Sequence, residues 1–172
     1  MRQVQPTEAD YRRAMAHFTT GVTVVTTLQQ GQPYGLTVSA FCSVSLVPLL
    51  TLVSLHRTSQ TGAIIGQSEI YAVNILGAGQ QPLVARFAGK GPRQKTFTDI
   101  PHHLGATGAP LFDEALARIE CRVVATYPGG DHMLLLGRVV AIECDDITGA
   151  SEPLLMYRTA FRALRSDAGA GM

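Results

Sequence analysis

Short β-branched segments separated by turns run through most of this 172-residue chain, and they limit the folds that it can adopt. The segment VTVVTTL at 22–28 is rich in β-branched residues, and YGLTVSAF at 34–41 alternates apolar and polar side chains. Further strands are expected at 49–55, 70–76, 117–127 and 132–143. No GxGxxG sequence occurs at a strand-to-helix turn, which disfavours a doubly wound parallel sheet. The pattern favours a mainly β protein, a closed or nearly closed antiparallel barrel with helical insertions.

Two or three helices are expected to interrupt these strands. The first begins after Thr7, which can cap it, and Gly21 can end it. Its apolar residues fall on one face at helical spacing, namely Tyr11, Ala14, Met15 and Phe18. Shorter helices are expected within 56–68 and within 80–89, the latter with Pro82 near its first turn.

The remaining segments are interpreted as loops or stay ambiguous. The stretch at 42–48 is expected to be a loop, and 90–110 a long Gly- and Pro-marked loop of the kind that is often functional. The segment at 153–164 fits either a strand or a helix, and the tail at 165–172 is expected to fray. The length suits one domain over 1–172, with its core at about 11–164.

Charge and cysteine usage exclude several classes of function. A net charge of +1 disfavours general binding to nucleic acid or to an anionic membrane, because both need a basic field. With 46% apolar and only 16% charged residues, some apolar surface is expected to be covered by another copy of the chain. The three cysteines, Cys42, Cys121 and Cys144, form no CxxC pair, so no metal site is expected. Since no signal peptide or membrane-spanning run is recognised, a cytoplasmic location is expected.

Hydroxyl groups gather at two places where a polar ligand can bind. Thr37 and Ser39 lie on one face of the expected strand, an arrangement that is also ordinary for a solvent-facing strand. Arg57, Ser59 and Thr61 precede or begin a short helix, where free N–H groups and the helix dipole attract anions. Taken alone, the second pattern favours a simple helix cap over a phosphate site.

The sequence GGDH at 129–132 places a charged residue and a histidine at the start of an apolar strand. Asp131 and His132 there fit either an ordinary turn or a reactive group at the rim of a pocket. His17 and His56 are interpreted as packing or surface residues. A basic group at 86–95 can meet nucleotide phosphates or be a solvated face; its members are Arg86, Lys90, Arg93 and Lys95. No GxSxG, HExxH or P-loop motif occurs.

In its order of segments the chain resembles the flavin reductase family of short enzymes that serve two-component monooxygenases. The resemblance covers most of 18–139, and its more specific pieces are GLTVSAFCSVSL at 35–46 and GDH at 130–132. The other matching pieces are FTTGVTVVTT, SQTGAIIGQSEIYAVNIL, QQPLVARFAG and ALARIECRVV. One departure is Val47, which stands before Pro48 where the family often has a second proline.

The resemblance implies a split β-barrel, a Greek-key antiparallel barrel that binds FMN or FAD, usually as a homodimer. It also implies roles for individual residues. The flavin ring edge and ribityl chain would meet Thr37, Val38, Ser39 and Ala40, and the flavin phosphate would lie near Ser54, Ser59 and Thr61. Phe87 and Ala88 would lie close to the ring. His132 would face the nicotinamide, and Asp131 would orient it.

The resemblance further implies a NADH- or NADPH-dependent oxidoreductase that reduces FMN or FAD and supplies reduced flavin to a partner monooxygenase. This fits the absence of a nucleophile or paired carboxylates, because the flavin and the nicotinamide perform the hydride transfer themselves. Two alternatives share the barrel, an FMN-binding electron carrier and a pyridoxine-phosphate oxidase-like flavoprotein. The choice between FMN and FAD, and between NADH and NADPH, stays open.

Overall fold

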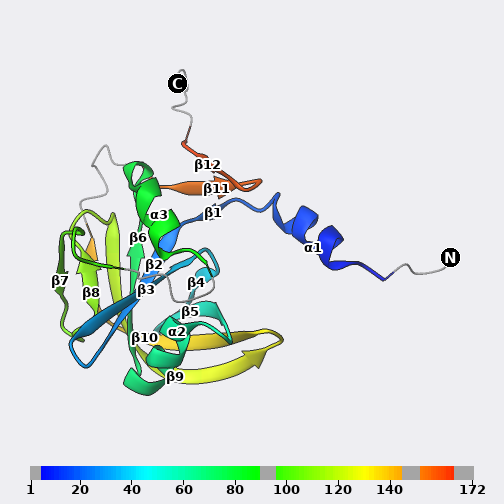
Figure 1. Cartoon of the computed structure of the whole chain (residues 1–172). Helices are drawn as coiled ribbons and strands as arrows, with labels where there is room; N and C mark the ends of the chain where they lie inside the picture. Colours follow the sequence, from blue (N-terminus) through cyan, green and yellow to red (C-terminus); the bar gives the residue numbers. More distant parts are fainter. Residues whose placement is uncertain (1–4, 90–95, 145–151, 165–172) are drawn as a thin grey trace.

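Seven antiparallel strands form the main sheet, in the order β3-β2-β6-β9-β10-β5-β4 (Figure 1). The computed structural model describes residues 5–89, 96–144 and 152–164. The strands of this sheet are β2 (Thr23–Gln29), β3 (Gln32–Val38), β4 (Phe41–Leu46), β5 (Leu49–His56), β6 (Ile70–Ile75), β9 (Ala117–Gly129) and β10 (His132–Cys144). The mainly β architecture that the sequence predicted is therefore confirmed.

A bend at Ser39 and Ala40 brings the two edges of this sheet together. The edge strands in the order are β3 and β4, yet only these two residues separate them along the chain. The carbonyl of Ala40 accepts a hydrogen bond of 2.9 Å from the N–H of Ser54 on β5, and Phe41 then pairs with Val53. The chain thus passes from one edge of the sheet to the other, which curls the sheet round on itself as a barrel requires.

The core follows from the alternation of side chains along the strands. On β5, Thr51, Val53 and Leu55 point inward and are buried, while the residues between them are half-buried. Strand β2 is buried on both faces, with its first five residues inside the protein. A second apolar cluster around Phe87, Phe97 and Phe112 covers the outer face of β2. Each fully buried aliphatic side chain contributes about 1.5–3 kcal/mol to stability.

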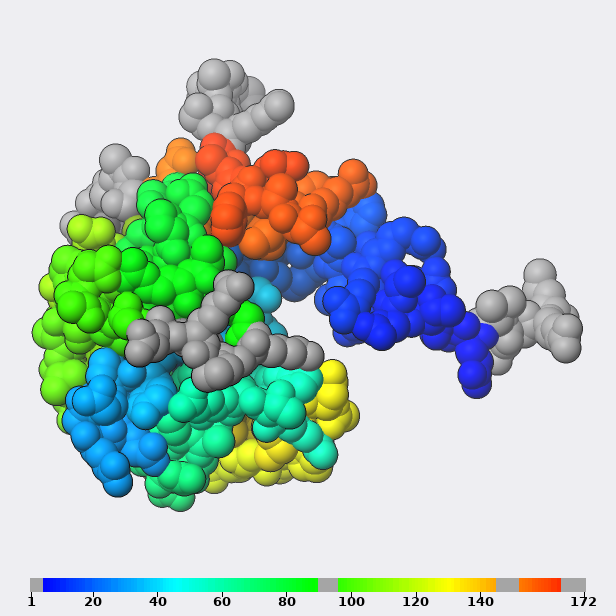
Figure 2. Space-filling model, in the orientation of Figure 1, coloured from blue at the N-terminus to red at the C-terminus, as the bar shows by residue number. Residues whose placement is uncertain are grey.

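The helix α1 (Glu8–Met15) is capped by Thr7 as predicted, but it ends at Met15 and not at Gly21. Its side chains make no core contact, and none of its residues is buried. Figures 1 and 2 show α1 standing away from the rest of the molecule. The expected apolar face is therefore exposed, at 65% for Tyr11, 46% for Met15 and 67% for Phe18.

Two segments predicted to be loops form strands. The stretch interpreted as a loop at 42–48 lies largely within β4, because its backbone pairs with β5 although its side chains face mostly outward. The predicted loop at 90–110 contains β7 (His102–Leu104) and the start of β8 (Pro110–Phe112), and it buries Phe97 and Ile100. Residues 90–95, with Lys90, Arg93 and Lys95, and the predicted frayed tail at 165–172 lie outside the described residues.

The ambiguous segment at 153–164 is a hairpin of β11 (Leu155–Tyr157) and β12 (Ala160–Arg162). Strand β11 pairs with the short β1 (Thr20–Gly21), which makes a separate small sheet. The other two helices lie within the expected ranges, as α2 (Gln60–Ser68) and as α3 (Gln81–Phe87), which follows the short helix η1 (Ala78–Gln80).

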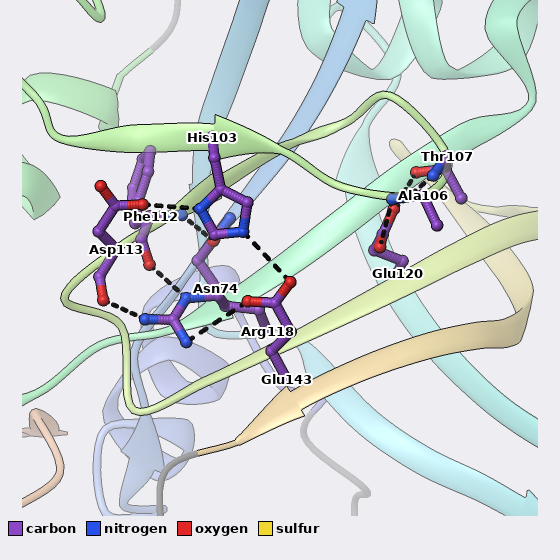
Figure 3. Close-up of polar contacts among 9 residues, drawn as sticks. All are labelled: Asn74, His103, Ala106, Thr107, Phe112, Asp113, Arg118, Glu120 and Glu143. Carbon is purple, nitrogen blue, oxygen red and sulfur yellow. Dashed lines mark hydrogen bonds and ion pairs between the residues drawn. The ribbon is translucent and has the colours of Figure 1, made fainter.

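Buried polar side chains of the barrel hold the β7–β8 hairpin in place (Figure 3). The carboxylate of Glu120 accepts hydrogen bonds from the N–H groups of Ala106 and Thr107, at 2.9 and 2.6 Å. At the other end of the hairpin, Asn74 accepts a hydrogen bond of 2.8 Å from the N–H of Phe112. Arg118 donates to the carbonyl oxygens of Phe112, the last residue of β8, and of Asp113. The hairpin is thus a fixed part of the barrel wall, because its removal would leave these buried groups unsatisfied.

Candidate functional site

The two histidines at one end of β5 and β10 face each other. Strand β10 begins at His132 directly after the turn at Gly130, which has a positive φ of 69°. His132 pairs with His56, the last residue of β5, and the two rings meet edge to face with their centroids 5.3 Å apart. Sequence reasoning interpreted His56 as a packing or surface residue. The pairing of two strands that are distant along the chain brings it to the candidate site.

The carboxylate of Asp131 lies between these two rings. Its Oδ1 atom is 2.7 Å from Nδ1 of His132, and its Oδ2 atom is 3.8 Å from Nε2 of His56. The hydrogen bond from His132 lowers the pKa of Asp131 below its ordinary value, so this carboxylate stays ionised near neutral pH. Arg57 joins the group from the end of β5, since its backbone N–H donates to the carbonyl of Asp131 at 3.0 Å. The predicted contact between Asp131 and His132 is present.

The predicted flavin segment lies at the bend between β3 and β4. Val38 is buried in the core, whereas Ser39 and Ala40 are exposed at the bend. The hydroxyl of Thr37 donates a hydrogen bond of 2.9 Å to the carbonyl of Val84 in α3. Ser39 and Ala40 are therefore the members of this segment most accessible to a ligand.

The start of α2 carries the predicted phosphate residues. Ser59 is the N-cap, and its hydroxyl oxygen accepts a hydrogen bond of 3.1 Å from the N–H of Gly62. That hydroxyl can still donate its hydrogen to an anion at the positive end of the helix dipole. Thr61 is buried, and its hydroxyl donates to the carbonyl of Gly35 at 3.1 Å. Ser54, on β5, is half-buried.

Phe87 lies in the core next to the candidate site. Its ring is fully buried and packs against Phe97 and Phe112, with ring centroids 5.1 and 5.7 Å away. It also lies against strand β3, where a Cβ atom on Gly35 would come within 2.7 Å of the ring. The next residue, Ala88, is half-buried at the end of α3. Of the two predicted ring-proximal residues, Ala88 is the more accessible.

Contacts join these pieces into one site around the start of α2. The N–H of Ser59 donates to the carbonyl of His56 at 2.8 Å, so His56 and the N-cap of α2 belong to one turn. Thr61 links that helix to β3, and Thr37 links β3 to α3. A separate hollow of about 310 Å³ beside α3 is lined by Arg86 and Asp99, which form an ion pair. Arg86 of the predicted basic group therefore lies apart from the residues predicted to bind the flavin.

The chemistry of this donor set fits a flavin. A helix N-terminus with Ser59 and the nearby cation Arg57 suit a phosphate tail. The exposed backbone and hydroxyl at the bend suit the polar edge of a planar ring.

Within the described ranges, no group of three or more His, Cys, Asp or Glu side chains could hold a metal ion. The helices of this described part are too short or too polar to cross a membrane.

Comparisons with known proteins agree with this arrangement. The family profile described as flavin reductase like domain matches residues 15–165. An NADH-dependent flavin reductase of a Rhodococcus species is 36% identical over 156 residues, which cover 89% of this chain and 84% of that protein. The reductase component of a Rhodococcus opacus 4-nitrophenol 4-monooxygenase/4-nitrocatechol 2-monooxygenase is 37% identical over 159 residues, which cover 92% and 82%.

Solved structures share the fold as well. The NADH:FAD oxidoreductase SgcE6 of Streptomyces globisporus, in complex with NAD and FAD fragments, matches with a TM-score of 0.87 and 33% identity. That match covers 98% of this chain and 100% of the other. Since the family profile spans most of the chain and these relatives match it over nearly their whole length, this chain belongs to the flavin reductase family.

Proposed function

We propose that this protein oxidises NADH or NADPH, reduces FMN or FAD, and supplies the reduced flavin to a partner monooxygenase. The observation that carries the proposal is that strand β5 holds the pieces of the site together. Its last residue, His56, pairs with His132 and accepts a hydrogen bond from Ser59, and Ser54 on the same strand donates to Ala40 at the bend. The names of the relatives support it, since one is NADH-dependent and another is the reductase component of a monooxygenase.

The residues of this chain bind and orient the reactants. The flavin, when bound, accepts a hydride from the nicotinamide nucleotide. Ser39 and Ala40 would hold the ring edge and ribityl chain, Ser54 and Ser59 would bind the phosphate, and Ala88 would line the ring. His132 would contact the nicotinamide side, where Nε2 of its neutral ring would accept a hydrogen bond, and the protonated ring would donate one and offset the negative charge of reduced flavin. Holding the two rings in contact is itself a large part of the catalysis.

The binding groups suit a flavin that leaves after reduction. They are hydroxyls, backbone groups and one arginine, Arg57, with no dense cluster of cations among the described residues of the site. Neutral hydrogen bonds contribute about 0.5–1.5 kcal/mol each, so the affinity for the flavin is modest. A modest affinity allows the reduced flavin to dissociate and bind to a second protein.

We further infer that the protein is a cytoplasmic homodimer with flavin bound near the subunit boundary. Exposed apolar side chains on and just after α1, and at the β4–β5 turn, support the dimer, because a second copy of the chain would cover them. The largest exposures among them belong to Phe18, Leu46 and Val47. Light scattering at micromolar concentration tests the assembly, and a monomer mass there overturns it.

Absorbance at the NADH band tests the function directly. The purified protein is mixed with NADH or NADPH, alone and with FMN, FAD or riboflavin. Oxidation that depends on added flavin is expected, and His17→Ala serves as a control because His17 lies outside the site. Background rates with all three flavins would reject the reductase and favour an electron carrier. Pyridoxine phosphate as the oxidised substrate would favour the oxidase-like alternative.

A further inference from the structure

The tautomer of His56 is determined by its neighbour Thr58. The backbone N–H of Thr58 points at Nδ1 of His56 at 3.2 Å, and the Thr58 hydroxyl lies 2.8 Å from the same atom. A backbone N–H can only donate, so Nδ1 of His56 accepts and carries no proton. The neutral ring therefore holds its proton on Nε2, and that is the atom that faces Asp131.

Asp131 connects the ring of His56 to the ring of His132. Its Oδ2 atom is 3.8 Å from Nε2 of His56, a distance longer than a direct hydrogen bond, so the carboxylate attracts the N–H group of His56 across a polar contact. Its Oδ1 atom is 2.7 Å from Nδ1 of His132. A carboxylate only accepts hydrogen bonds, so Nδ1 of His132 is the protonated nitrogen. The second nitrogen, Nε2, is then the ring atom through which His132 can meet a ligand.

The exposure of the three side chains indicates which of them holds the other two in position. His56 is 25% exposed, Asp131 is 77% exposed and His132 is 40% exposed. A carboxylate as exposed as that of Asp131 loses side-chain entropy when it is held in one position, and a surface ion pair by itself contributes little. His56 is the best anchored of the three, because Thr58 fixes its ring and β5 fixes its backbone.

We propose that His56 is a positioning residue that holds Asp131 and the ring of His132, and so presents Nε2 of His132 to the nicotinamide. The inference deepens the proposed function and rests on it. Two contacts act together, the polar contact of His56 with Asp131 at 3.8 Å and the edge-to-face contact of the two rings at 5.3 Å. In the described part of the chain, His132 contacts the side chains of Asp131 and His56, and Nε of Arg57 lies 3.5 Å from the His132 carbonyl.

Two substitutions separate the two contacts. His56→Phe keeps a ring beside His132 but removes both nitrogens, whereas His56→Gln keeps an N–H donor near the position of Nε2. We expect His56→Phe to raise the KM for NADH about two- to threefold, the low end of the range for a hydrogen bond, because this polar contact is longer than one. Flavin affinity should change little. His56→Gln should recover most of the difference, and His17→Ala should behave like the unchanged protein.

A readout independent of activity is the ¹⁵N spectrum of the labelled imidazole rings, assigned by His132→Ala. In the unchanged protein, neutral His132 should carry its proton on Nδ1. In His56→Phe, and likewise in Asp131→Asn, this population should shift toward the Nε2 tautomer that predominates in free histidine. Because the spectrum needs no substrate, it tests the positioning role even if the protein proves not to oxidise NADH.

Three outcomes would overturn the role of His56. The first is an unchanged tautomer of His132 in His56→Phe. The second is an unchanged KM for NADH in an otherwise active enzyme. The third is an equal rise in the KM for NADH in His56→Phe and His56→Gln, accompanied by a lower thermal midpoint in both variants. His56 would then act only in folding. Background NADH oxidation together with a shifted tautomer would reject the reductase function and leave the contact itself supported.

Discussion

The hydroxyl of Thr61 donates a hydrogen bond of 3.1 Å to the carbonyl of Gly35, and so joins the start of α2 to strand β3. The contact is buried, and Gly35 lies directly against the ring of Phe87. Two residues earlier, Ser59 is only half-buried and caps the same helix. The two hydroxyls that the sequence paired as phosphate ligands therefore differ in what they contact, and they can be separated by mutation.

Replacing Thr61 by Val should lower the free energy of unfolding. It should not weaken the binding of FMN more than the binding of riboflavin, which has no phosphate. The substitution keeps the shape of the side chain but leaves the buried carbonyl of Gly35 without its donor, which costs about 1–3 kcal/mol. Urea denaturation measures the loss, and Thr98→Val on the exposed surface is the control. A preferential loss of FMN over riboflavin in Thr61→Val would instead return Thr61 to the phosphate site.

Replacing Ser59 should change flavin affinity in a way that depends on charge. Asp caps helices as well as Ser does, so Ser59→Asp should keep α2 folded while placing a negative charge where the phosphate is expected. FMN binding should then weaken by about tenfold or more, because a charge-assisted hydrogen bond is lost and repulsion is added. Riboflavin has no phosphate, and its affinity should stay close to the original value.

The matched variant is Ser59→Asn, which caps the helix without a charge. It should lie between the unchanged protein and Ser59→Asp in its affinity for FMN. Fluorescence titration with the two flavins gives both constants. If FMN and riboflavin weaken equally in Ser59→Asp, the phosphate lies elsewhere and Ser59 acts only as a cap.

His132→Ala should slow the reduction of flavin by NADH and raise the apparent KM for NADH, while flavin affinity changes little. His132→Asn keeps a hydrogen-bond donor but cannot be charged, so it should recover part of the rate if hydrogen bonding is the main contribution. Stopped-flow absorbance of the flavin measures the reduction step. An unchanged rate in His132→Ala would leave this histidine as a residue of the turn.

Elements determined by local sequence were predicted well. The β-branched run of β2 and the Gly-Gly turn between β9 and β10 act over a few residues, and both lie close to where the sequence predicted them. The strand β4 was missed because its exposed serines resemble a loop, and only pairing with β5 makes it a strand. The β7–β8 hairpin depends on Asn74, Arg118 and Glu120, which no local pattern connects to it.

The same distinction applies to the candidate site. Asp131 and His132 are neighbours in sequence, so their contact could be anticipated. His56 joins them only through the register of β5 and β10, which sequence reasoning did not derive. Tyr11 and Met15 lie on α1 as their apolar spacing predicted, whereas Phe18 lies beyond the end of the helix, and periodicity does not say what covers that face. The burial of Phe87 likewise follows from the packing of Phe97 and Phe112 around it.

The last prediction concerns pH and the ring of His103, which links β7 to β10 (Figure 3). Its Nδ1 is 2.7 Å from a carboxylate oxygen of Asp113, and its Nε2 is 3.2 Å from one of Glu143, which also lies 3.8 Å from Arg118. Carboxylates only accept, so both ring nitrogens must be protonated for both contacts to form. The contacts with Asp113 and then Glu143 raise the pKa of His103 above its ordinary value of 6.5.

A pKa that is higher in the folded state means that protonation stabilises the fold. The contribution of His103 is therefore fully present below pH 6.5, and it is lost as the pH rises through the raised value. Thermal midpoints measured across this range should fall more steeply with pH in the unchanged protein than in His103→Gln, which cannot be charged. The difference should be modest, because the His103 side chain is 45% exposed. His17→Gln controls for the other histidines, and identical slopes in the unchanged protein and His103→Gln would show that the paired imidazolium does not contribute.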